Sequence, residues 1–130
     1  MSALITVEPD EAQTEALRPV EESYTAFLAQ PLSTDALQNL TIAVDDFTAL
    51  LPAQWLKDLE DSNAKDGATP LDEIYGDFPL LALYLVDTFH QLLHVNDISA
   101  IKRVVGTFGE DLYELVLYSD DWDSNYRSWK

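Results

Sequence analysis

Apolar residues recur every three or four positions over much of this chain, and that spacing constrains the fold more than any other feature. The clearest run comprises Leu37, Leu40, Val44, Phe47 and Leu51. This spacing places the side chains on one face of an α-helix, which is then buried against another element. Ser33-Thr34-Asp35 supplies a cap for the start of this helix, and Pro52 ends it.

Similar patterns predict helices elsewhere. One starts at Pro9-Asp10-Glu11, where acidic side chains suit the helix dipole, and Pro19 predicts a kink or a second helix start. A short helix follows Pro52, and the most apolar helix covers about 79–95. Two more carry the apolar residues of 101–105 and 112–116, and Gly106 or Gly109 is expected to end the first of them. We therefore expect one all-α domain over residues 1–130, with about five or six helices.

Three segments are less regular. Residues 61–77 contain two glycines and a proline among polar residues, which predicts a loop. A short strand over Tyr113–Tyr118 is the main alternative to the last helix, because apolar and aromatic residues crowd together there. Residues 119–130 form an acidic and aromatic tail without a clear period.

The charge excludes whole classes of function. The chain has 24 Asp and Glu but seven Lys and Arg, for a net charge of −17. Nucleic acids and anionic membranes carry the same sign, so we expect the chain to bind neither directly. The absence of cysteine excludes disulfides, thiol catalysis and Cys-based zinc sites. The beginning of the sequence has no basic, apolar leader pattern, and we expect a cytoplasmic protein.

Sites for chemistry are few. His90 and His94 are four residues apart on a predicted helix, with Asp87 one turn earlier, which is a weak candidate for a metal site. The H-E-x-x-H motif needs a glutamate where Gln91 stands, and two histidines do not fill a tetrahedral site. We expect a polar stripe here, and we predict no catalytic residue and no cofactor.

Two acidic segments resemble the opening of a calcium loop. In Asp121-x-Asp123-x-Asn125 the sixth position is tyrosine instead of the required glycine, and the segment from Asp61 to Glu73 has its glycine one place late. We interpret both as solvated acidic segments.

Three explanations compete for the charge excess. It is expected in a protein that recognises a basic partner, in a protein of a saline cytoplasm, and in one selected for solubility. The first is favoured, and it predicts a non-enzymatic inhibitor, immunity protein, antitoxin or DNA mimic that neutralises a basic nuclease or DNA- or RNA-binding enzyme. The alternatives are a metal-dependent enzyme using Asp87, His90 and His94, and a small homodimeric adaptor.

A binding site for a basic protein needs carboxylates beside an aromatic anchor. Two regions combine them. The first is the loop with Asp72, Glu73, Tyr75 and Asp77. The second, which we favour, is the tail with Asp120, Asp121, Trp122 and Asp123, together with the preceding acids Glu110, Asp111 and Glu114.

Overall fold

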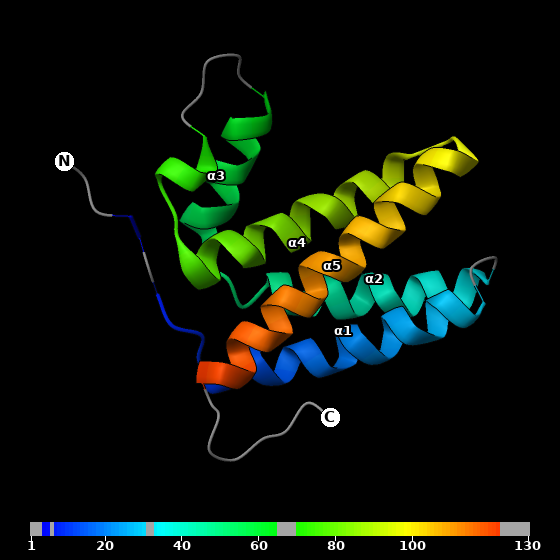
Figure 1. Ribbon diagram of the computed structural model, residues 1–130, viewed down its shortest axis with the longest axis horizontal. Coiled ribbons are helices and arrows are strands. Elements are labelled where there is room, and N and C mark those ends of the chain that lie inside the picture. The colour runs from blue at the N-terminus through cyan, green and yellow to red at the C-terminus, as the bar shows by residue number, and fades with distance from the viewer. Residues whose placement is uncertain (1–3, 6, 31–32, 65–69, 123–130) are drawn as a thin grey trace. The chain divides into compact units, whose positions relative to one another are not determined.

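The structure is a computed structural model that describes residues 4, 5, 7–30, 33–64 and 70–122, and its regular elements there are helical (Figure 1). In chain order they are α1 (Glu11–Ala29), α2 (Thr34–Thr48), α3 (Ala53–Ala64), the 3-10 turn η1 (Leu71–Glu73), α4 (Asp77–His94) and α5 (Ile98–Trp122). The predicted all-α fold is confirmed. The elements divide into two compact units, Asp10–Leu51 and the pair of segments Met1–Pro9 and Pro52–Lys130, and the expectation of a single domain stays a prediction.

The unit Asp10–Leu51 is a helical hairpin of α1 and α2. Ser33 caps α2 as predicted, because its hydroxyl accepts a hydrogen bond from the Ala36 N–H at 3.1 Å. Helix α1 continues through Pro19, so no second helix starts there. The largest side chains that this hairpin buries are apolar and come from both helices: Leu17, Val20, Phe27, Leu40, Val44 and Phe47.

Gln13 joins the two ends of the hairpin. Its Oε1 accepts a hydrogen bond from the Asp10 N–H at 2.9 Å, and its backbone N–H donates to Asp10 Oδ1 at 2.7 Å, which forms a capping box. Its Nε2 donates to the carbonyl of Leu50 at 3.1 Å, just beyond α2. One buried side chain therefore caps α1 and fastens the end of the hairpin to its beginning.

The second unit is built around the hairpin of α4 and α5, with α3 and η1 beside it. The rings of Phe89 and Phe108 lie 5.8 Å apart between the two long helices. Helix α5 runs unbroken through Gly106 and Gly109, where the sequence predicted an end. Each glycine costs about 1 kcal/mol in a helix interior. The burial of one continuous face outweighs that cost, and this face comprises Val104, Phe108, Leu112, Leu115 and Val116.

Three other expectations are corrected by these boundaries. Residues 113–118 lie inside α5, so no strand forms there. The predicted loop 61–77 is shorter, because α3 continues to Ala64, η1 lies within the segment and α4 starts at Asp77. The backbone of 119–122 continues α5, while the rest of the predicted tail lies outside the described residues.

The beginning of the chain is fastened to the residues that precede α4. The Ile5 N–H donates to the Ile74 carbonyl at 2.8 Å, and the Gly76 N–H donates to the Ile5 carbonyl at 3.0 Å. These bonds form an isolated parallel bridge between Ile5 and Tyr75. Within the described part of the chain, the helices lack the combined length and apolarity that crossing a bilayer requires.

We predict that Gln13→Glu destabilises the chain by about 1–3 kcal/mol. The substitution keeps the side-chain length and the acceptor for the Asp10 N–H, but it removes the donor to Leu50 and buries a charge. Urea unfolding measures the change. Gln38→Glu, at an exposed position of α2, adds the same charge and is the control. Equal losses in the two variants would show that the Leu50 bond contributes nothing.

Candidate functional site

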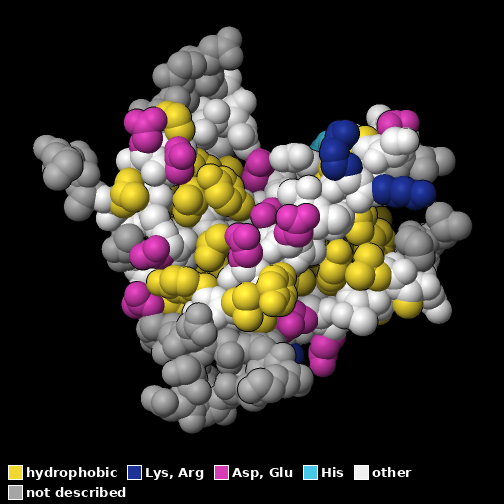
Figure 2. Space-filling view, in the orientation of Figure 1, with side chains coloured by type: hydrophobic (Ala, Val, Ile, Leu, Met, Phe, Trp, Pro, Cys, Tyr) yellow, Lys and Arg dark blue, Asp and Glu magenta, His cyan; other side chains and the backbone are white. Residues whose placement is uncertain are grey.

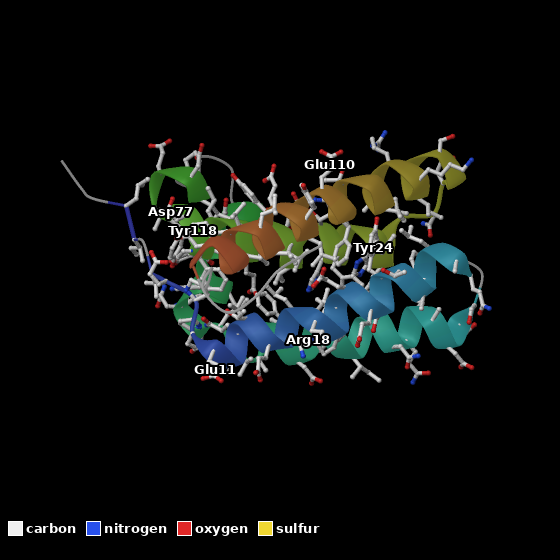
Figure 3. All side chains as sticks on the ribbon, turned by 60° about the horizontal axis from the view of Figure 1, so that its bottom comes forward. Glu11, Arg18, Tyr24, Asp77, Glu110 and Tyr118 are labelled. Carbon is white, nitrogen blue, oxygen red and sulfur yellow. The ribbon has the colours of Figure 1, made fainter. Side chains whose placement is uncertain are left out.

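Two of the carboxylates predicted on the last helix, those of Glu110 and Glu114, lie on α5 away from its buried face. Glu110 and Glu114 are exposed, and Asp111 between them is half-buried. They are positioned by the apolar residues that alternate with them, because Phe108, Leu112 and Leu115 turn inward at helical spacing. Figure 3 shows the side chain of Glu110 projecting outward from the helix.

Asp111 is the carboxylate of this group that is engaged with a neighbouring helix. Its Oδ2 accepts a hydrogen bond from the hydroxyl of Thr88 on α4 at 2.6 Å. Burial raises the pKa of Asp111 above its ordinary value; the Thr88 bond lowers it, and the charges of Glu114, Glu110 and Asp87 raise it again. The raised pKa of Asp111 therefore reflects burial first and the neighbouring negative charges second.

Tyr84 on α4 connects the two acidic regions that the sequence suggested. Burial raises the pKa of its hydroxyl, and the charges of Asp72 on η1 and Asp111 on α5 raise it further. Acids from both η1 and α5 therefore act electrostatically on the same tyrosine. Asp72 from the loop region and Asp111 from the α5 region thus belong to the acidic surface of this unit, and Figure 2 shows acidic and apolar side chains interspersed over α4 and α5.

The other acids of the predicted loop are also at the surface. Asp72, Glu73 and Asp77 are exposed. Asp77 is the first residue of α4 and has a φ of 50°, a left-handed conformation that aspartate tolerates better than most residues. Its charge acts on the hydroxyl of Tyr118, whose pKa is raised mainly by burial and then by the charges of Glu8 and Asp77. Figure 3 shows Asp77 and Tyr118 close together.

Tyr75 was expected to offer an aromatic ring to a partner, but the structure places it in the core with an exposed fraction of 0%. Its ring lies edge-on to Trp55 at 5.9 Å, and Trp55 lies edge-on to Phe78 at 6.3 Å. Its hydroxyl donates to Asp58 Oδ2 at 2.5 Å. Burial raises the pKa of Tyr75 well above its ordinary value, and the bond to Asp58 and its charge raise it further. The ring is therefore not available to a partner.

The tail residues are only partly described. Asp120, Asp121 and Trp122 lie in the backbone of the last turn of α5, but their side chains are outside the described set, as is Asp123 altogether. The prediction that they contact a partner stays a prediction.

The histidine pair lies on the exposed side of α4 near its end. His94 Nδ1 is 2.8 Å from the carbonyl oxygen of His90, and the two rings stack at 6.4 Å. Asp87 accepts hydrogen bonds from Asn63 Nδ2 at 2.8 Å and from Gln91 Nε2 at 3.1 Å. Among the described residues, no three His, Asp or Glu side chains gather closely enough to hold a metal ion.

Three exposed apolar residues beside the acids were not predicted from the sequence. Tyr113 and Leu117 on α5 have exposed fractions of 64% and 38%, and Tyr84 on α4 has 39%. For Tyr113 and Leu117 the sequence held a signal of exposure. Both fall on the polar side of the helical pattern that Leu112, Leu115 and Val116 define.

Comparison with known protein families, curated proteins and solved structures finds no match to this chain. The function must therefore be argued from the acidic surface itself.

We predict that Tyr75→Phe lowers the free energy of unfolding by about 1–2 kcal/mol, because it removes a hydrogen bond to a carboxylate while keeping the buried ring. The matched control is Tyr118→Phe. The Tyr118 hydroxyl is 3.3 Å from both oxygens of Glu8 at the surface, so its loss should change stability by less than about 0.5 kcal/mol. Urea unfolding compares the two variants. Equal losses of unfolding free energy in the two variants would mean that the buried bond from Tyr75 to Asp58 stabilises the fold no more than the surface bond of Tyr118 does.

We predict that Asp111 makes the chain more stable as pH falls from 7 towards 4. Its pKa is raised in the folded state, so the folded state binds more protons than the unfolded state in this window. The stabilisation is complete below the unfolded pKa of about 3.9 and is lost as pH rises through the folded pKa.

Asp111→Asn keeps an oxygen that can accept the Thr88 bond but removes the titrating group. Urea midpoints at pH 7 and pH 5 should therefore differ less in this variant than in the wild type. Asp46→Asn, at an exposed position of α2, removes an equal charge and is the control. A wild-type midpoint that falls on acidification, or an unchanged difference in Asp111→Asn, would contradict the prediction.

Proposed function

We propose that this chain is a non-enzymatic acidic binding protein that neutralises a basic, nucleic-acid-acting protein such as a nuclease or a DNA- or RNA-binding enzyme in the cytoplasm. The observation that carries the proposal is the net charge of −17 combined with the acidic surface formed by η1, α4 and α5. Repulsion among these carboxylates lowers the stability of the fold. A protein that uses the negative field to recognise a partner gains a function in exchange for that loss of stability.

The way in which the carboxylates are held supports this proposal. Thr88, Tyr75 and Asn63 donate hydrogen bonds to Asp111, Asp58 and Asp87 respectively. Each donor is neutral. Such a bond orients the carboxylate without cancelling its charge, so the negative field remains available to a partner.

The charge is also segregated along α5. Lys102 and Arg103 lie in its first turns, while Glu110, Asp111 and Glu114 lie further along. Figure 2 shows Lys and Arg side chains near the end of the hairpin where α5 begins. Glu110 is seven positions after Arg103, a rise of about 10 Å along the helix. The acids thus present a surface of one sign, which is what electrostatic steering of a basic protein needs.

The mechanism is replacement of nucleic acid in a basic groove. Glu110 and Glu114 are one turn apart, about 6 Å along the helix axis. Carboxylates repeated at this spacing present regularly spaced negative charge, as a phosphate strand does, and occupy Lys and Arg sites that otherwise hold phosphates. Binding of the chain then excludes the nucleic acid.

Affinity capture from native lysate with competition by DNA tests the proposal. The immobilised chain should retain a basic nucleic-acid-binding protein at low salt, and duplex DNA should elute it, because both ligands use one groove. Adding the chain to the identified protein should inhibit its action on nucleic acid. Retained proteins that are not basic, that DNA does not displace, or whose activity is unaffected would contradict the proposal. The control bait is Glu11→Gln/Glu15→Gln, altered on α1, which should capture the same protein.

A further inference from the structure

The outward side of α5 carries two large apolar residues that contribute little to the core. Tyr113 and Leu117 are one turn apart and have exposed fractions of 64% and 38%. Single exposed apolar residues are ordinary, but a pair at i and i+4 on one helix forms a common contact surface. The opposite side of the same helix already supplies buried residues, so this pair is not needed to hold α5 in place.

A row of carboxylates lies beside that pair. Glu110 and Glu114 have the same one-turn spacing and are both exposed. At 100° per residue, the four residues 110, 113, 114 and 117 fall within about 100° of arc, away from the buried face. We call these four residues the α5 face. It combines an apolar pair with an acidic pair in parallel rows.

On the side of the α5 face that is nearer to α4, a further carboxylate and a further aromatic ring follow. The bond between Asp111 and Thr88 fixes where α5 lies beside α4. Tyr84 on α4 is 39% exposed, and the charge of Asp111 contributes to the raised pKa of its hydroxyl. An aromatic ring next to carboxylates suits a Lys or Arg side chain, which gains cation–π contact and ion pairing together.

We infer that the α5 face is the docking surface for the basic partner, and that the partner contributes an amphipathic helix whose apolar stripe is flanked by Lys or Arg. This inference rests on the proposed function and specifies its site. Apolar side chains of the partner helix cover Tyr113 and Leu117, while its basic residues, one turn apart, meet Glu110 and Glu114. Residues one turn apart on the partner helix have the same spacing as those on α5. A helix therefore fits the two rows better than an extended strand, whose side chains are spaced differently.

Charge argues against a second copy of this chain as the occupant. A two-fold contact through the α5 face would bring the Glu110 and Glu114 rows of both copies together, and each copy carries a net charge of −17. Like charges placed against one another oppose association. A basic helix removes the same apolar surface from water and compensates the carboxylates.

The probe for the test is a synthetic helical peptide in which leucines at i, i+3, i+4 and i+7 are flanked by lysines. Fluorescence anisotropy compares its affinity for the full chain with that of a scrambled peptide and of an oligolysine of equal charge. At about 0.15 M salt, where surface charges are screened beyond about 8 Å, the amphipathic peptide should bind at least about tenfold more tightly than either.

Two pairs of variants locate the site. Glu110→Gln/Glu114→Gln should weaken binding of the peptide by about tenfold or more, whereas Glu11→Gln/Glu15→Gln should change it by less than about threefold. The control pair is exposed, has the same spacing and removes the same charge. Tyr113→Ala/Leu117→Ala leaves the charge unchanged and should also weaken binding by about tenfold or more, while Ile42→Ala, an exposed apolar control on α2, should not. Unchanged urea midpoints would show that the variants remain folded.

The outcomes separate the site from the function. Equal losses in the two glutamate pairs would overturn the α5 face while leaving a charge-driven function standing. Binding of oligolysine as tight as that of the amphipathic peptide would overturn the helical occupant. Self-association of the purified chain that Tyr113→Ala/Leu117→Ala abolishes would assign the face to a second copy and overturn the inference. Failure of the proposed function is seen independently in the capture experiment, when DNA displaces no basic protein.

Discussion

Hydrogen bonds from neutral donors to carboxylates are the interaction on which the polar organisation of this chain depends. With 24 acids and seven bases, at least 17 acids lack a one-to-one basic partner. At several positions a neutral hydroxyl or amide group donates a hydrogen bond to the carboxylate in place of a basic side chain. Examples are the bonds from Tyr75 to Asp58, from Thr88 to Asp111 and from Asn63 to Asp87. Such bonds connect helices within one unit and are stronger than bonds between neutral groups. An ion pair would connect the same helices but would remove the field that the proposed function needs.

The apolar pattern predicted the helices because burial of one face depends only on the spacing of residues along the chain. A cap at Ser33 and a helix start at Asp10 were also identifiable, because both signals are local. The helix end predicted at Gly106 or Gly109 is not observed. A glycine signals a helix end through its own backbone preference, whereas the continuity of α5 depends on a buried face that runs past both residues.

The candidate site was predictable in composition but not in assembly. Glu110, Asp111 and Glu114 were recognisable from the charge pattern alone. That Asp111 and Asp72 both act on Tyr84 was not, because these three residues are far apart in sequence and only the fold brings their charges to bear on one hydroxyl. Tyr75 had the same local signature as an exposed anchor, an aromatic ring among acids. Its burial follows from contacts with Trp55 and Asp58, which no local pattern specifies.

The insertion of one unit within the other has a consequence for synthesis on the ribosome. The hairpin Asp10–Leu51 is contiguous, and the clasp of Gln13 onto Leu50 closes it as soon as α2 has emerged. The flanking unit has to wait, because Ile5 finds its partners only at Ile74 and Gly76, and α4 then needs α5. Local contacts form faster than distant ones. The hairpin is thus expected to be complete while Ile5, which precedes it in the chain, still lacks its partners.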